Sequence, residues 1–345
     1  MQLRTLLFAS IAILLTAIIY SMSGSAQQAL LLESKQGKFV VGSRPIPKPG
    51  PGEILVKLRA TALNPVDWKI QKYGIFITEF PAVLGTDGAG EVEQVGEGVT
   101  NFSKGDRVFF QGTFDNDRAT FQQYTIAAAA TASKIPSNLS FEAASTIPVA
   151  FTAAYVGLYN HQPYGLELAW PLESADRVIQ LARLSGFSPI ITTASSKHAD
   201  YLKSLGATNV LDRSLSLESL QAEIKKLTNT PVDIVFDAIS SKETQQTGHD
   251  LLVPGGHLVT VLPLAITKSE KIGHVGVQGI LRLPQNQELL RALYSNFTQL
   301  LEEKAIIPNR FVVLSDGLHG IIGGLQRLEN NQVSGVKLVA RPRGA

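Results

Sequence analysis

The sequence predicts an α/β protein with a small β-rich half and a doubly wound parallel sheet. Two observations lead to this prediction. From Gly37 to about Pro136, short alternating segments are separated by Gly and Pro turns, which is typical of an irregular β-barrel. From Ala143 onward, helix-like and strand-like segments alternate, as in parallel βα units.

Length and composition agree with two globular domains. The chain has 345 residues, of which 44% are hydrophobic and 17% charged, enough for two hydrophobic cores. Its 31 basic and 29 acidic residues form no long run of one sign, so we expect no nucleic-acid partner. There is no cysteine, which excludes disulfides, thiolate metal ligands and a cysteine nucleophile.

Residues 1–26 form a hydrophobic segment that resembles a signal peptide or an anchor. The run at 6–20 is uncharged and of roughly the length of a secretory h-region. Gly24 and Ala26 suit a cleavage site, and Met22 stands where the apolar run ends. Translation from Met22 predicts a cytoplasmic protein, in which the segment is an artefact. A genuine segment predicts a membrane-anchored or secreted one.

The first half contains strands with one buried face. In "KPGPGEILVKLRATAL" a Pro/Gly turn precedes Ile54, Val56 and Leu58, which alternate with polar residues. The segments "AGEVEQVGEGV" and "KGDRVFFQG" repeat this pattern with glycines at the turns. We therefore assign residues 37–150 to a β-barrel-like domain.

The second half alternates between helices and strands. We expect helices near 175–185, 197–205 and 217–227, and strands near 190–193, 210–211, 232–239 and 257–263. From Pro284 an amphipathic helix is followed by the strand-like "RFVVL" and "GVKLVA". Residues 151–283 form the doubly wound domain, and residues 284–345 return to the first domain.

An ordered set of phrases resembles one enzyme superfamily. "NPVDWKI", "FPAVLGTDGAGEVEQVGEGVTNFSKGDRVF", "ASTIPVAFTAAYVGLY", "SSKHADYLKSLGA" and "SGVKLVARP" resemble the medium-chain dehydrogenase/reductase superfamily. Within it the chain is most similar to the zinc-free enoyl reductase and quinone oxidoreductase branch, especially fungal trans-acting enoyl reductases of the ToxD type, which belong to secondary metabolism. The resemblance extends over nearly all of residues 37–342.

The resemblance implies a GroES-like β-barrel domain split around a Rossmann-like domain, with NADPH in the cleft between them. It implies hydride transfer to an activated C=C bond of an enoyl thioester, enone or quinone, with the cofactor supplying the chemistry. The implied partners are a small-molecule or acyl-thioester substrate and, as a further option, an acyl carrier protein or polyketide synthase.

We expect no metal. Zinc-dependent members carry Cys, His and Glu ligands where this chain has Asn64, Gly85, Thr86 and Asp87. None of these is Cys or His, and the histidines are scattered.

The resemblance places the catalytic residues near the start of the chain. Tyr73 matches a proposed proton donor, since an enolate must be stabilised and protonated. The alternative is a cleft tyrosine with a wet hydroxyl. Lys69 matches a residue along the nicotinamide ribose, together with Val66, Asp67 and Trp68, and is alternatively a solvated lysine.

Further residues match the cofactor site. Thr152 resembles a threonine beneath the nicotinamide and is alternatively a helix cap. After the strand "IITTAS", Ser195, Ser196 and Lys197 bring hydroxyls and a cation but no carboxylate, which favours the 2′-phosphate of NADPH over NADH; Ser196 could also cap the next helix. The resemblance also assigns His198, Val261, Leu262 and Ser334 to this site. Relatives often carry a tyrosine after the Asp of the next strand, where this chain has Arg213, which could stack on adenine or pair with a phosphate.

The glycine turn that cradles the coenzyme diphosphate is missing. Relatives carry a strand and a G-G-S-S-x-V-G loop before the helix that reads "RVIQLARLSG" here, whereas this chain has "AWPLESAD". Glu173 and Asp176 would occupy the positive helix end and repel a diphosphate. We expect the first strand to be deleted, "GLELAW" to be a weak substitute, and NADPH not to be held tightly.

Three explanations remain open. The first, which we favour, is an exon omitted from an ordinary reductase. The second is a catalytically dead paralogue that acts as a binding or accessory protein. The third is an enzyme that holds its cofactor with a different loop.

Overall fold

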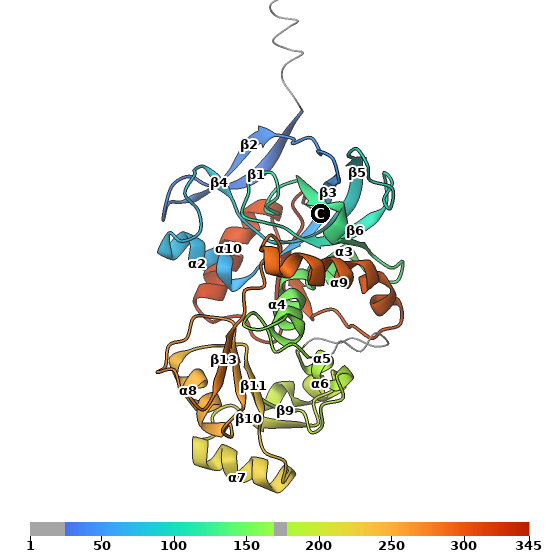
Figure 1. The fold of residues 1–345 in the computed structure, drawn as a ribbon. Helices are drawn as coiled ribbons and strands as arrows, with labels where there is room; N and C mark the ends of the chain where they lie inside the picture. The colour runs from blue at the N-terminus through green and yellow to red at the C-terminus, as the bar shows by residue number, and fades with distance from the viewer. Residues whose placement is uncertain (1–24, 169–177, 345) are drawn as a thin grey trace, which may run out of the picture.

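The computed structural model describes residues 25–168 and 178–344. The chain forms two halves joined by helices at the centre of the molecule (Figure 1). The upper half contains the N-terminal strands and the C-terminus, and the lower half contains β9 to β13. This arrangement confirms the predicted α/β class with a barrel-like domain and a Rossmann-like domain.

The upper half is built around a long central strand. β3 (Glu53–Ala62) is the strand predicted from alternation, and its Ile54, Val56 and Leu58 are fully buried. It lies in a sheet of order β14-β15-β3-β5-β6-β8, and β7 also pairs with β3. The other strands of this sheet are β5 (Asp87–Val95), β6 (Arg107–Gln111), β7 (Tyr124–Ala128), β8 (Ala132–Lys134), β14 (Phe311–Val313) and β15 (Lys337–Ala340).

A smaller sheet covers the N-terminal side of this half. It has the order β2-β1-β4, with β1 (Ala26–Leu32), β2 (Phe39–Pro45) and β4 (Ala82–Val83). β1 lies ahead of residue 37, where we placed the start of the domain. In the tail, β15 pairs antiparallel with β3, so residues 337–340 belong to the main sheet of the upper half.

Helices of the upper half surround an aromatic core. They are α2 (Pro65–Tyr73), η1 (Ala129–Thr131), α3 (Phe141–Ser145), α4 (Pro148–Tyr159), α9 (Pro284–Glu302) and α10 (Gly317–Glu329). Phe151 of α4 and Phe297 of α9 lie 4.8 Å apart between ring centroids, and Tyr155, Tyr294 and Phe109 pack around them. Among the described residues, the helical stretch Phe141–Tyr159 is apolar and long enough to cross a membrane, but 67% of it is buried inside the protein.

The lower half contains two separate parallel sheets. One joins β9 (Ile191–Ala194) and β10 (Asn209–Asp212), and the other joins β11 (Ile234–Asp237), β12 (His257–Thr260) and β13 (Gly273–Gly276). The accompanying helices are α5 (Val178–Leu184), η2 (Ser196–His198), α6 (Ala199–Ser204), α7 (Leu217–Leu227) and α8 (Lys242–Leu251). β13 lies in a glycine-rich stretch where we expected a loop. Only Val275 of this strand is buried, so the sequence shows no alternation of apolar and polar residues there.

The division of the parallel sheet falls where the first strand was predicted to be missing. No strand among the described residues joins β9 to β11, so each has one unpaired edge. The expectation that "GLELAW" forms a strand is wrong for residues 166–168. Their N–H groups donate to Gly157, Asn160 and Leu158 at the end of α4, because these orphan helix carbonyls are nearer partners than the sheet. Trp170 and the acidic residues Glu173 and Asp176 lie outside the described residues.

The divided sheet predicts uneven protection of backbone amides. We expect amide hydrogens of β9 and β11 to exchange faster than those of β12, because β12 pairs on both sides and the other two strands on one. Hydrogen–deuterium exchange with mass spectrometry measures this difference. Equal protection of the three strands would show that β9 and β11 are paired along both edges in solution.

Candidate functional site

A buried ion pair lies at the centre of the upper half. The Lys337 ammonium donates to Asp87 Oδ2 and, at 2.8 Å, to Asn64 Oδ1. Asn64 Nδ2 also donates to Asp87 Oδ2 at 2.9 Å, and the Val149 N–H donates to Asp87 Oδ1 at 2.7 Å. The Asp87 side chain is fully buried and that of Lys337 is 14% exposed. The cluster therefore joins β15, β5, α4 and the residue that precedes α2.

Asp67 is a second buried carboxyl group beside this ion pair. It lies in the first turn of α2, and its Oδ2 accepts the Asn64 N–H at 2.7 Å, while Oδ1 has no hydrogen-bond partner. Burial, with a smaller repulsion from Asp87, raises the pKa of Asp67 to about 7. We predicted that Asp67 lies along the coenzyme ribose; in this structure its side chain is fully buried.

The residues at this position do not fit a zinc ion. An ammonium group occupies the space among Asn64 and Asp87, and a second cation there would be repelled. Across residues 25–168 and 178–344, no group of three His, Cys, Asp or Glu side chains could hold a metal. The absence of a metal site remains a prediction.

A pocket of about 260 Å³ opens between the two halves beside Lys337. Its lining residues come from α4, α6 and the C-terminal segment, and they are Ala150, Tyr201, Asn309, Gly335, Val336 and Lys337. Thr152, predicted to lie beneath the nicotinamide, is fully buried in α4, where its hydroxyl interacts with the Tyr294 hydroxyl. It is not a helix cap, because α4 begins four residues earlier, at Pro148.

The predicted phosphate-binding loop lies on the other side of this pocket. Ser195 and Ser196 follow β9, and neither side chain caps a helix; the alternative reading of Ser196 as a cap is therefore wrong. His198 is half-buried. Its Nε2 lies 3.0 Å from the Ser334 hydroxyl oxygen, and its Nδ1 lies 3.2 Å from Arg310 Nη2. The structure thus brings together two predicted cofactor residues, His198 and Ser334, from different halves.

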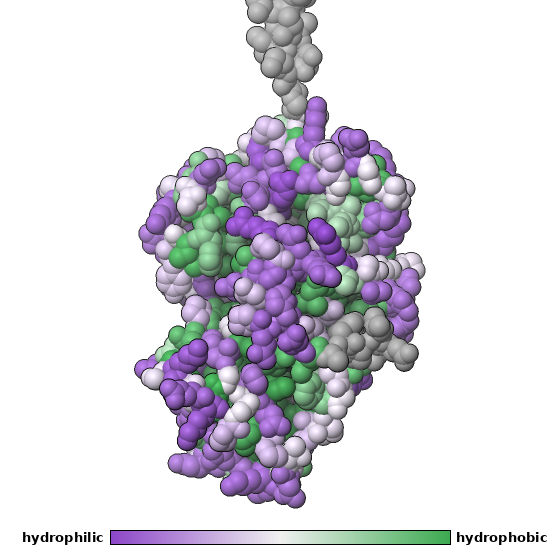
Figure 2. Space-filling model, viewed as in Figure 1, coloured by the Kyte–Doolittle hydropathy of each residue, from purple (hydrophilic) through white to green (hydrophobic). Residues whose placement is uncertain are grey.

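The residues predicted around Tyr73 form an exposed aromatic surface. Tyr73 is 54% exposed, and its ring centroid lies 6.0 Å from that of Trp68. The Lys69 ammonium lies over the Trp68 ring, 5.7 Å from its centroid. Val66 is half-buried on the same helix. Figure 2 shows apolar side chains gathered over the α2 region on the left of the upper half, where Phe76 is 63% exposed.

The remaining predicted residues lie at strand ends of the lower half. Arg213 is exposed after β10, and Val261 and Leu262 follow β12. The Val261 N–H donates to Ser240 Oγ, so its backbone is already engaged. Carboxyl ends of parallel strands are where ligands bind in such folds.

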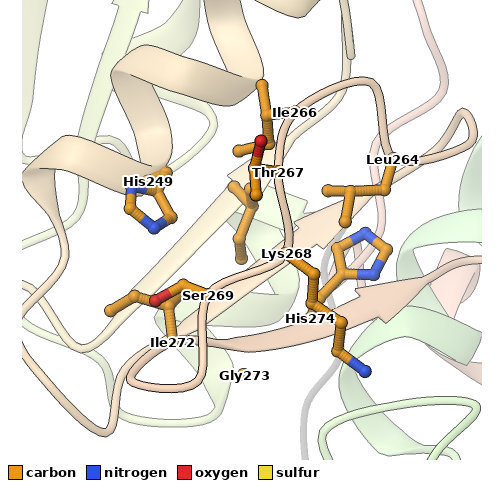
Figure 3. Close-up of a pocket in the computed structure, with 10 residues that line it drawn as sticks. His249, Leu264, Ile266, Thr267, Lys268, Ser269, Ile272, Gly273 and His274 are labelled. Atoms are coloured by element: carbon orange, nitrogen blue, oxygen red, sulfur yellow. The ribbon is translucent and has the colours of Figure 1, made fainter.

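A second cavity, behind β12 and β13, is too small for a ligand. His249 and His274 lie on opposite sides of it, among residues of the 264–273 loop (Figure 3). Its volume is about 10 Å³, which is room for about one water molecule. His274 lies 2.9 Å from Thr260 Oγ1, and burial lowers its pKa.

Sequence comparisons agree with this architecture. Residues 50–137 match the alcohol dehydrogenase GroES-like domain, and residues 177–271 match the zinc-binding dehydrogenase domain. The trans-enoyl reductase resD of Aspergillus sclerotiorum is 32% identical over 91% of this chain and 99% of that protein. The trans-enoyl reductase ACTTS2 of Alternaria alternata is 32% identical over 91% and 98%.

Solved structures share the fold. The quinone oxidoreductase of Coxiella burnetii is 25% identical, with a TM-score of 0.67 over 91% of this chain and 99% of that one. An alcohol dehydrogenase superfamily protein from Novosphingobium aromaticivorans is 24% identical, with a TM-score of 0.76 over 91% and 98%. The fold defines a two-domain dehydrogenase, and the chain belongs to the medium-chain dehydrogenase/reductase superfamily, among the relatives of the fungal trans-enoyl reductases.

The comparisons also bear on the divided sheet. The alignment with resD spans 362 positions, more than the 345 residues of this chain, although it covers only 91% of the chain. The relative therefore carries internal segments that this chain lacks. The match to the second domain begins only at residue 177, after the position of the expected glycine turn.

The described residues supply part of a site for a nicotinamide coenzyme. The pocket beside Lys337 could receive a polar group, and the loop of Ser195 and Lys197 could receive a phosphate. For the diphosphate between them, the described residues offer no glycine turn between β9 and β11.

The raised pKa of Asp67 predicts a pH-dependent stability. The folded-state pKa lies above the unfolded value of 3.8, so the protonated carboxyl stabilises the fold at low pH, and this contribution is lost as pH rises through about 7. We expect Asp67→Asn to be more stable than the wild type at pH 8 by up to roughly 4 kcal/mol, with the difference shrinking toward pH 4. Urea unfolding across this pH range measures it, with Asp200→Asn, an exposed carboxylate, as the control. A pH-independent difference would contradict the assignment.

The ion pair predicts a large cost for removing its cation. Lys337→Met leaves the buried Asp87 carboxylate without its counterion, and we expect a loss of about 3 kcal/mol of unfolding free energy. Asp87→Asn in the same chain should restore part of it, because the remaining buried groups are then neutral. Urea denaturation gives both values. Lys72→Met, which removes an exposed ion pair with Glu329, is the matched control and should change little; an equally small effect at Lys337 would show that the pair is solvated.

Proposed function

We propose that this protein is an NADPH-dependent oxidoreductase of the enoyl reductase type, which reduces an activated C=C bond of an enoyl thioester, an enone or a quinone. The observation that carries the proposal is the similarity to trans-enoyl reductases over nearly their whole length, at 32% identity. Both domains of that architecture are present here.

The choice of NADPH rests on the loop after β9. When bound, the coenzyme supplies the hydride. Enzymes that use NADH usually end this strand with a carboxylate that binds the ribose hydroxyls, whereas here Ser195, Ser196 and Lys197 offer hydroxyls and a cation. The nearby Asp212, at the end of β10, is engaged by Ser214, whose N–H and hydroxyl both donate to its Oδ1.

The proposed proton donor is Tyr73. Hydride addition places negative charge on the substrate carbonyl oxygen, and a phenol can protonate the resulting enolate. Tyr73 lies at the end of α2, beside Trp68 and Lys69, with its ring half in solvent and therefore accessible to a substrate. The exposed Phe76, stacked on Phe114 at 5.8 Å, offers an apolar wall next to it.

The divided sheet favours a second candidate. A paralogue that has lost its diphosphate cradle could bind an acyl substrate or carrier without reducing it, as an accessory protein. Such a protein would be folded and would bind an acyl carrier protein or acyl thioester, but not NADPH. The two candidates therefore differ in coenzyme binding.

The proposed function predicts NADPH oxidation with an enoyl thioester. We expect a purified full-length chain to oxidise NADPH in the presence of crotonyl-CoA, followed at 340 nm, and Tyr73→Phe to lower kcat by about 10²-fold because the proton donor is lost. Tyr164→Phe, which changes another exposed tyrosine away from α2, is the control. Unchanged kcat in Tyr73→Phe would assign the proton to another group.

Absence of coenzyme binding in the wild type would favour the accessory protein. In that case a chain into which a relative's first strand and glycine loop have been inserted between residues 168 and 178 separates the two candidates. Recovery of NADPH binding and turnover would show that only the cradle is missing. A folded insertion variant that binds NADPH without turnover would identify a paralogue that has also lost catalysis.

A further inference from the structure

Three cations, Lys197, Arg213 and Arg310, gather around His198 at the junction of the two halves. Lys197 and His198 come from the loop after β9, Arg213 follows β10, and Arg310 lies next to β14 in the other half. Among the described residues, Lys197, Arg213 and Arg310 form no ion pair with a carboxylate. The folded state keeps these like charges together, so an anion there would be attracted by all of them.

Arg310 is held in place rather than free in solvent. Its guanidinium lies over the Tyr201 ring, 3.8 Å from the centroid, and its Nη2 lies 3.2 Å from His198 Nδ1. Its carbonyl accepts the Lys337 N–H at 2.8 Å, which anchors it beside the 260 Å³ pocket. A guanidinium fixed in this way loses little conformational freedom when it binds a ligand.

His198 is neutral in this arrangement. Arg310 can only donate, so Nδ1 of His198 accepts, and Nε2–H donates to the Ser334 hydroxyl at 3.0 Å. Burial and the charges of Lys197, Arg310 and Arg213 lower the pKa of His198. A dianion bound among these groups would favour the imidazolium and give His198 a proton to donate.

The position of Gly335 keeps this cluster compact. Its backbone has φ +66°, and a Cβ there would lie 2.5 Å from His198 Cε1 and 2.9 Å from Arg310 Nη2. Because Gly335 has no side chain, the backbone of the C-terminal segment can lie this close to His198 and Arg310. Ser334, Gly335 and Arg310 all come from the half of the molecule opposite His198 and Lys197.

We propose that Arg310, with His198, Lys197 and Ser334, forms an interdomain site for a phosphate monoester, which both halves of the protein bind together. On the proposed function the ligand is the ribose 2′-phosphate of the coenzyme, and Arg310 is then a selectivity residue supplied by the substrate domain. A separate phosphorylated small molecule would present the same chemistry, a compact dianion with three acceptor oxygens.

Calorimetry on the full-length chain tests this site directly. We expect 2′-AMP to bind at least tenfold more tightly than adenosine, and Arg310→Leu to weaken 2′-AMP by about tenfold or more, the loss expected for a charge-assisted hydrogen bond. Arg310→Lys, which keeps the charge but not the planar fork, should be intermediate. Arg291→Leu, an exposed arginine on α9 without an ion pair among the described residues, should stay within about twofold of the wild type.

Measurements of coenzyme and inorganic phosphate separate the two ligand sources. If the coenzyme is the source, Arg310→Leu lowers the ratio of NADPH to NADH affinity about tenfold. If 2′-AMP and inorganic phosphate bind in an Arg310-dependent manner but NADPH does not, the phosphate site stands and the proposed function fails. If NADPH is bound and oxidised with the same selectivity in Arg310→Leu, the proposed function stands and the phosphate site is overturned.

The proposal can also be tested on the wild type, by measuring the pKa of His198, in case the Arg310 variants do not fold. The pKa of the His198 imidazole, assigned with His198→Asn and followed by NMR, should rise when inorganic phosphate or 2′-AMP is added, because a dianion favours the imidazolium. The charged groups facing it are Lys197, Arg213 and Arg310. An unchanged His198 pKa at saturating ligand would overturn the proposal, as would equal binding of adenosine and 2′-AMP.

Discussion

The buried ion pair between Lys337 and Asp87 is the interaction on which the rest of the site depends. It ties the C-terminal strand β15 to β5, to the start of α2 through Asn64, and to the start of α4 through the Val149 N–H. Because the carboxylate is fully buried, its charge requires these partners to stay in place. The same lysine borders the interdomain pocket, so the charge that fixes the upper half also sets the electrostatics of the cleft.

The divided parallel sheet is the second constraint, and it acts on the lower half alone. In a doubly wound sheet the first strand is central, and both of its neighbours depend on it for half of their hydrogen bonds. Here β9 remains paired only with β10, and β11 only with β12, among the described residues. The upper half, with its continuous sheet and aromatic core, does not depend on that strand. Any loss of stability should therefore be confined to the coenzyme-binding half.

The sequence predicted those strands and domains whose pattern of apolar and polar residues lies within one continuous stretch of the chain. The alternation of Ile54, Val56 and Leu58 identified β3, and the ordered phrases predicted both domains. Elements without a period were missed, such as β13, where only Val275 is buried. The site was less predictable because its contacts are long-range. His198 and Ser334 are 136 residues apart, and Arg310, which lies outside the phrases that carry the family resemblance, reaches His198 only through the fold. Lys337 was visible in "SGVKLVA", but its partner Asp87 lies 250 residues away.

The two constraints together determine how a ligand can enter the cleft. A stretched dinucleotide is normally bound along its whole length, and the diphosphate contributes through the helix end and glycine turn. Without that turn among the described residues, affinity must come from the Lys337 pocket and the adjoining cationic junction around Arg310, which share Tyr201 and Gly335. The contact between His198 and Ser334 joins the two halves at this junction. A phosphate group bound at this junction contacts residues of both halves at once, so its binding depends on the two halves staying together. The ribose 2′-phosphate of the coenzyme and a small phosphate monoester both present this group, and they differ in whether the rest of the ligand finds partners in the half with the divided sheet.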